Sequence, residues 1–247
     1  MCFGSLGGGV TPFAPPSWDL AGEDGTFGNR FDDPSAAHGR PASERFRVVY
    51  CASTRAAAFG ETVARFRPGL SLLAELAAIE DEEPLDVQIG GLLDPVDRRR
   101  GVIPADWRLR RHLASTRLDP SLRFVDVAVA ASLQHLRSAL APVAAGLGLA
   151  DIDLGAVTGS HRRLTQACAR YIYEQVDEQD APRFAGLRYP SRLNNQWECW
   201  AIFHDRIRHA PRFPESIFPD EPDLETVAAI YGLAIEVFEG HYVRPEG

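Results

Sequence analysis

Residues 46–66 read FRVVYCASTRAAAFGETVARF, a strand pattern that passes directly into a helix pattern. In residues 46–51 the apolar side chains fall on both faces of an extended chain, which is typical of a buried strand. Thr54 then begins an alanine-rich helix that extends to about Phe66, and Phe59, Val63 and Phe66 recur at helical spacing as its core stripe. This stretch predicts a fold in which helices pack on a sheet.

The rest of the chain alternates between strand and helix patterns without a regular β-α-β period, which favours an α+β fold over a doubly wound sheet. We expect strands or extended segments over 109–118, 122–128, 184–189, 197–203 and 233–238, and helices over 130–141, 160–176 and 223–231. Ser160 is the expected N-cap of the helix over 160–176. Its inward face should consist of Leu164, Cys168, Tyr171 and Ile172.

The chain is expected to form one domain, because 247 residues with 45% hydrophobic content can bury a single large core. Residues 1–44 are rich in Gly, Pro, Ser and Asp, so we expect a loop-rich N-terminal arm with little regular structure. Residues 45–247 would form the remainder of that domain. The net charge of −8 disfavours direct binding to nucleic acid or to an anionic membrane surface.

Several common sites and signals lack support in the sequence. The four cysteines form no CxxC pair, so we expect reduced thiols and a cytoplasmic protein, with no signal peptide and no membrane-spanning run. His204, Asp205 and His209 lack the spacing of a zinc helix, and the glycines at 7–9 and 146–148 lack the context of a phosphate loop. The arginines at 98–100 and at 108, 110 and 111 are either a solvated surface or a contact for an acidic partner.

Four segments carry a family resemblance: Gly28-Asn-Arg-Phe-Asp-Asp-Pro34, Val49-Tyr50, Glu61, and Tyr189-Pro-Ser-Arg-Leu-Asn194. In this order and spacing they resemble the RES family, which is named for its Arg, Glu and Ser. Gly101-Val-Ile-Pro104, Thr165-Gln-Ala167 and Ala201-Ile-Phe203 extend the resemblance over most of the chain.

The resemblance implies a single compact RES domain, similar to the core of the ADP-ribosyltransferase toxins, with mixed or antiparallel sheets flanked by helices. It also implies that NAD is held in a cleft as the substrate and degraded, without a metal. RES proteins are commonly toxins, and the implied partner is a cognate antitoxin protein with an Xre-like DNA-binding part.

The resemblance assigns roles to four residues, which are expected to form the catalytic site. Glu61 would stabilise the cation-like ribose as nicotinamide departs. Arg30 would bind the pyrophosphate through its forked guanidinium. Tyr50 would stack on nicotinamide with its hydroxyl free for a hydrogen bond, and Ser191 would organise the site rather than attack. Asn194 is added as an NAD-binding candidate beside Arg30, Tyr50 and Ser191.

Each of these residues also has an ordinary structural interpretation. Glu61 would otherwise be a solvated helix residue, Tyr50 a half-buried strand aromatic, and Arg30 a partner of Asp32 or Asp33 in a loop. Ser191 and Asn194 are also typical turn residues. In addition, the family usually carries an arginine upstream of Arg30, where this chain reads Pro12-Phe-Ala-Pro-Pro-Ser-Trp18. Arg192, Arg188 or Arg55 would replace it, or catalysis would be weaker.

Three functions follow from the sequence as hypotheses. The first is an NAD glycohydrolase or phosphorolase, in which water or phosphate accepts the ribosyl group. The second is an ADP-ribosyltransferase that modifies a cellular protein through the same residues. The third is a catalytically inactive binding module that keeps the fold, an alternative that the missing upstream arginine leaves open.

Overall fold

The computed structural model describes residues 2–7, 13–23, 25–34, 39–77, 101–207 and 214–237. The strands are β1 (Cys2–Gly7), β2 (Val48–Ala52), β3 (Val102–Ile103), β4 (Arg111–Thr116), β5 (Phe124–Asp126), β6 (Gly186–Pro190), β7 (Glu198–Phe203), β8 (Glu215–Ser216) and β9 (Ala234–Ile235). The helices are α1 (Arg55–Val63), α2 (Leu70–Ala77), α4 (Ala105–Leu109), α5 (Ala130–Ala139), α6 (Ala141–Gly146), α7 (Leu154–Thr158), α8 (Arg162–Tyr173) and α9 (Pro222–Tyr231). Short 3-10 turns are η1 (Trp18–Leu20), η3 (Ala42–Glu44), η4 (Ala64–Phe66) and η6 (His204–Arg206).

Seven of these strands form one mixed sheet in the order β5-β6-β7-β2-β1-β4-β8. The strands β5 and β6 run parallel, and each other neighbouring pair in this sheet is antiparallel. Two short strands, β3 and β9, pair in parallel as a separate sheet. The mixed sheet with its packed helices confirms the predicted α+β class.

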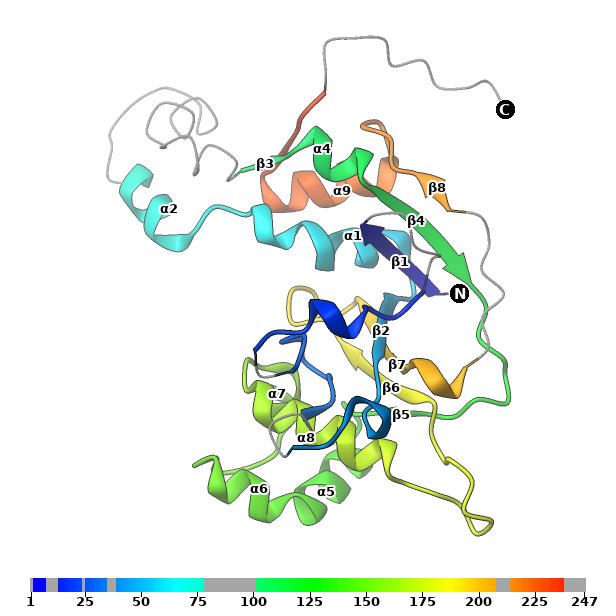
Figure 1. Ribbon diagram of the computed structural model, residues 1–247. Coiled ribbons are helices and arrows are strands. Elements are labelled where there is room, and N and C mark those ends of the chain that lie inside the picture. The colour runs from blue at the N-terminus through cyan, green and yellow to red at the C-terminus, as the bar shows by residue number, and fades with distance from the viewer. Residues whose placement is uncertain are drawn as a thin grey trace.

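The helices gather in two groups along the sheet (Figure 1). One group, α5 to α8, lies beside β5 and β6, and α8 contacts β6. The other group, α1, α4 and α9, lies toward β1 and β4, with α1 packed on β1, β2 and α9. The central strand β2 therefore lies between the two groups.

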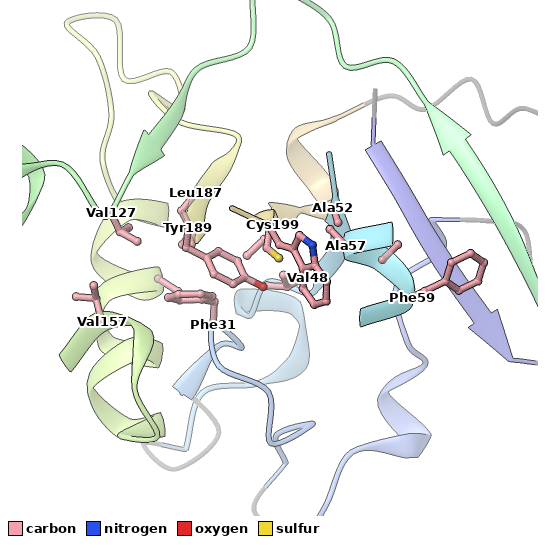
Figure 2. Close-up of a cluster of buried hydrophobic side chains, with 14 of the residues drawn as sticks. Phe31, Val48, Ala52, Ala57, Phe59, Val127, Val157, Leu187, Tyr189 and Cys199 are labelled. Carbon is pink, nitrogen blue, oxygen red and sulfur yellow. The ribbon is translucent and has the colours of Figure 1, made fainter. Parts of the chain in front are cut away.

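The main core fills the sheet face that these helices cover. Figure 2 shows the rings of Phe31 and Tyr189 next to each other, with centroids 4.8 Å apart. Val48 and Cys199 continue this core toward Phe59 of α1. On the other sheet face, a smaller cluster contains Val49 and Cys51 of β2. Both faces of β2 are thus covered, as its sequence predicted.

The opening stretch folds largely as predicted. The strand occupies Val48–Ala52, and α1 begins after Thr54, whose hydroxyl accepts a hydrogen bond from the Ala57 amide at 3.1 Å. Phe59 and Val63 are fully buried, and Phe66 packs against the core from the following 3-10 turn. Strands and helices also occur within or next to the other predicted ranges, although most are shorter than predicted.

Two expectations about regular structure were wrong. Cys2–Gly7 is not loop but the strand β1, because its backbone pairs with β4 over six residues. The N-cap of α8 is His161 and not Ser160, and it makes no side-chain cap hydrogen bond. The helix predicted over 130–141 ends at Ala139, and Pro142 lies in the first turn of the next helix, α6, where its missing N–H is tolerated.

The remaining sequence expectations can be placed only in part. Gly8, Gly9, the arginines at 98–100, His209 and Phe238 lie outside the described residues. Cys51, Cys168 and Cys199 are buried thiols that belong to no disulfide. Within the described ranges, no helix combines the length and apolar character needed to cross a bilayer.

Candidate active site

A pocket of about 340 Å³ opens on the sheet face between α1 and α8. The helix α1 contributes Ala58, Glu61 and Thr62, and α8 contributes Arg162. The remaining lining residues come from the arm, from β2, β6 and β7, and from the loop after β6: Asn29, Arg30, Tyr50, Cys51, Ala52, Tyr189, Cys199 and Arg192. The pocket therefore brings together segments that are widely separated in sequence.

The register of three strands positions part of the pocket floor. Tyr189 of β6 pairs with Cys199 of β7, which in turn pairs with Ala52 of β2. Because directly paired residues on neighbouring strands share a face, these three side chains form one row across the sheet. Small side chains at Ala52 and Cys199 leave room above the row, and Ala58 of α1 lines the same space.

Glu61 is exposed on α1, and the buried Ser191 orients it. The Ser191 hydroxyl donates to Oε1 of Glu61 and accepts from the Leu193 amide at 2.9 Å. The Ser191 amide donates to the Trp197 carbonyl at 2.8 Å, so the serine backbone is also held. These contacts fix one carboxylate oxygen of Glu61 and join residues that are 130 positions apart.

The backbone next to Glu61 lies directly against an aromatic ring. A Cβ added at Gly60 would come within 2.0 Å of the buried Trp197 ring, so a side chain does not fit there. The Tyr231 hydroxyl of α9 donates to the Gly60 carbonyl at 3.3 Å, and the Trp197 and Tyr231 rings pack edge to face. Burial, with a smaller contribution from the Glu61 charge, raises the pKa of Tyr231 to about 12.

The contact at Gly60 leads to a stability prediction. Gly60→Ala should lower the free energy of unfolding by about 1–3 kcal/mol, because a methyl group must displace the Trp197 ring or the helix. Gly146→Ala is the matched control, since nothing lies within 4 Å of its added Cβ at the end of α6. Urea unfolding of both variants measures the difference, and equal stabilities would contradict the proposed close packing.

The segment that carries Arg30 is held mainly through its backbone. The Thr165 hydroxyl of α8 donates to the Arg30 carbonyl at 2.5 Å, and the side-chain amide of Gln166 donates to the Asn29 carbonyl at 3.1 Å. The Arg30 guanidinium lies 5.4 Å from the Tyr189 ring centroid, within cation-π range. Its Nε is buried without a hydrogen-bond partner in the described part of the chain. The arm is thus fixed while the guanidinium keeps a free donor.

Tyr50 differs from its sequence-based role. Its ring lines the pocket, but its hydroxyl is not free: it donates to Oδ1 of Asp32 at 3.0 Å and accepts from the Phe31 amide at 2.8 Å. Oδ2 of Asp32 accepts from the Asn29 amide at 2.7 Å. Burial raises the pKa of Asp32 and raises that of Tyr50 well above its usual value. The hydroxyl therefore holds the Arg30 segment in place.

Removing this hydroxyl tests its structural role. Tyr50→Phe should lower the free energy of unfolding by about 2 kcal/mol, because the buried Asp32 carboxylate and the Phe31 amide each lose a partner. Thermal unfolding checks this, with Tyr171→Phe as the control, since the Tyr171 hydroxyl contacts His135 in an exposed position. The assignment fails if both variants lose the same stability.

Three arginines line the pocket: Arg30, Arg162 and Arg192. None of them belongs to an ion pair within the described ranges. The other two arginines considered as replacements for the upstream arginine are occupied. Arg188 pairs with Asp126 and Glu198, and Arg55 pairs with Glu215 and Glu221. Of the three candidates to replace the upstream arginine, which are Arg192, Arg188 and Arg55, Arg192 is therefore the one that lines the pocket.

The sequence does not single out Arg162, because an arginine at the start of an amphipathic helix resembles a solvated residue. The sequence signal that could have identified Arg162 is its position three residues before the Thr165-Gln-Ala167 stretch. Thr165 and Gln166 of this stretch hold the Arg30 segment. Asn194 lies elsewhere: its side chain accepts from the Gln196 amide at 3.0 Å and its carbonyl from the Trp197 amide, as in a turn. It does not line this pocket.

The arrangement suits a ligand with an electron-poor centre and a separate anionic group. An oriented carboxylate stabilises positive charge, and guanidinium groups without ion-pair partners bind phosphate or carboxylate groups. The pocket volume falls within the usual range for small-molecule sites. Among the described side chains, no group of three or more His, Cys, Asp and Glu is placed to hold a metal ion.

Comparison with protein families matches the RES domain to residues 95–225, just over half of the chain. The chain belongs to the RES domain family. The matched range of this RES domain includes Arg162 and Ser191, whereas Arg30, Tyr50 and Glu61 precede it. The pocket and the contact between Ser191 and Glu61 connect the two parts. Searches of curated proteins and of solved structures found no match to the chain.

Proposed function

We propose that this RES domain binds NAD in the pocket and cleaves the bond between nicotinamide and ribose. The observation that carries the proposal is the meeting of two chemical groups in one pocket. Glu61, oriented by Ser191, shares the pocket with Arg30 and Arg162, whose side chains each keep a buried nitrogen without a partner in the described chain. NAD presents the complementary pair, a positively charged pyridinium riboside and a pyrophosphate.

Glu61 would act on the ribose. As the bond breaks, its electron pair moves to the pyridinium nitrogen, so nicotinamide leaves as a neutral molecule and the ribose carbon becomes cation-like. The nearby Glu61 carboxylate stabilises this developing charge, which lowers the barrier. The Ser191 hydroxyl donates to Oε1 of Glu61. This contact orients the whole carboxylate, so it also sets the direction of Oε2.

Arg30 would bind the pyrophosphate, and Tyr50 would contribute its ring rather than its hydroxyl. The backbone of the Arg30 segment is held by Thr165 and Gln166, so the guanidinium is positioned before the substrate arrives. The Tyr50 ring remains available to pack against nicotinamide, because its hydroxyl is directed to Asp32. The acceptor is water, which yields ADP-ribose and a proton, or phosphate, which yields ADP-ribose phosphorylated at the anomeric carbon of the former nicotinamide ribose.

We propose that this cleavage makes the protein a toxin that lowers cytoplasmic NAD and that a cognate antitoxin with an Xre-like DNA-binding part neutralises it. The support is the RES domain match together with the Arg30, Tyr50, Glu61 and Ser191 set. Growth arrest on expression of the active chain, with a fall in cellular NAD, is the expected result. An unchanged NAD level during growth arrest would contradict this role.

The proposed reaction is tested by following NAD, free nicotinamide and the ribosyl product over time with purified protein, with and without phosphate. Nicotinamide release supports the proposal, and the co-product separates hydrolysis from phosphorolysis. Release that occurs only with an added acceptor protein, together with labelling of that protein, identifies an ADP-ribosyltransferase. No release under any of these conditions overturns the proposal and favours the binding module.

A further inference from the structure

Arg162 occupies a position that the function of Glu61 and Arg30 does not explain. It is the first residue of α8, it lines the pocket, and its Nη1 is buried without a hydrogen-bond partner in the described ranges. A buried guanidinium nitrogen without a partner is unfavourable, because it loses the hydrogen bonds that water would supply. A ligand that accepts this hydrogen bond would remove the penalty.

Among the residues that the structure describes, no acidic side chain forms an ion pair with Arg162. The Arg162 charge acts on Asp32 and opposes the rise in its pKa, so the two groups are neighbours. However, Oδ1 of Asp32 already accepts from the Tyr50 hydroxyl at 3.0 Å and Oδ2 from the Asn29 amide at 2.7 Å. The start of α8 also carries the positive end of the helix dipole. The local field therefore favours an anion.

Direct contacts relate the two arginines to Glu61. The Arg30 guanidinium lies 5.4 Å from the centroid of the Tyr189 ring, and Tyr189 is two residues before Ser191, which donates to Glu61. Arg162 instead begins α8, and Thr165 and Gln166 of that helix hold the backbone of the Arg30 segment. Arg30 is thus linked to Glu61 through Tyr189 and Ser191, and Arg162 lies on the helix that packs against the Arg30 segment.

On the basis of the proposed NAD cleavage, we propose that Arg162 binds the adenylate-side phosphate of NAD while Arg30 binds the nicotinamide-side phosphate. With the ribose at Glu61, the two phosphates of a dinucleotide would follow in the order of the two arginines. One guanidinium for each phosphate matches the charge of a pyrophosphate. Arg162 therefore selects a dinucleotide over a mononucleotide.

Nicotinamide mononucleotide separates the two arginines, because it carries the nicotinamide-side phosphate alone. In Arg162→Ala, the ratio of kcat/KM for NAD to that for the mononucleotide should fall about tenfold, the loss expected for one charged hydrogen bond. In Arg30→Ala both values should fall, so their ratio should change much less. Arg163→Ala is the control, since Arg163 is exposed on the same helix turn and does not line the pocket.

A binding measurement tests Arg162 independently of catalysis. Calorimetry with ADP-ribose should give a Kd about tenfold higher for Arg162→Ala than for the unmodified chain and Arg163→Ala. An unchanged Kd, or an equal loss of activity on NAD and on the mononucleotide, overturns the role of Arg162. Absence of nicotinamide release by the unmodified chain instead overturns the proposed reaction, and the calorimetric result still decides on Arg162.

Discussion

Glu61→Gln is expected to slow nicotinamide release from NAD by about a thousandfold, the largest single effect in this pocket. The amide keeps the shape of the side chain and can still accept the Ser191 hydrogen bond through its carbonyl oxygen. It lacks the negative charge that stabilises the ribose cation. Because Glu61 is exposed on α1, the fold should survive the change.

The measurement is single-turnover cleavage of NAD, with circular dichroism and thermal unfolding to verify the fold. Glu225→Gln is the control, because Glu225 is exposed on α9 and lies outside the pocket lining. It removes the same charge from the protein without touching the site. Full activity in Glu61→Gln would contradict the assignment of this carboxylate as the group that stabilises the ribose cation.

Arg30→Ala is expected to raise KM for NAD by about fiftyfold. A hydrogen bond between the charged guanidinium and a phosphate oxygen contributes about 1.5–3 kcal/mol to the free energy of substrate binding. The backbone contacts from Thr165 and Gln166 are kept, so the segment should stay in place and kcat should fall much less. Arg30→Lys should recover part of the affinity, since it restores the charge but not the fork.

Steady-state kinetics of the Ala and Lys variants separate these effects. Arg55→Lys is a useful control, because Arg55 forms its ion pairs with Glu215 and Glu221 outside the pocket. If KM stays unchanged in Arg30→Ala, the pyrophosphate does not lie against this residue. If kcat alone collapses, Arg30 acts on the reacting ribose rather than on substrate binding.

The sequence predicted β2 and α1 because periodicity records which side chains face a core, and Phe59 and Val63 lie at those spacings. It failed at β1, where Cys-Phe-Gly-Ser-Leu-Gly has a loop-like composition. The pairing of β1 with β4 depends on backbone hydrogen bonds to a strand more than a hundred residues away. The composition of residues 2–7 alone does not predict pairing with such a distant strand.

The candidate site could be predicted from the sequence only through the family resemblance. That resemblance selected Arg30, Tyr50, Glu61 and Ser191, and the chain places all but Ser191 on the pocket wall, with Ser191 behind Glu61. It could not reveal that the Tyr50 hydroxyl is directed to Asp32, or that Arg162 lines the pocket. The first depends on how β2 packs against the N-terminal arm and the second on how α8 does, and both are tertiary contacts.

The pairing of β1 divides the large sheet into two parts. The register between β1 and β4 contains six residue pairs, whereas that between β1 and β2 contains the single pair Phe3 and Ala52. One part, β5-β6-β7-β2, carries the strand residues that line the pocket, and none of the lining residues belongs to β1, β4 or β8. The β1-β4-β8 part therefore reaches the site indirectly, through the backbone pair at Ala52 on the pocket floor and through the packing of β1 on α1, the helix that carries Glu61.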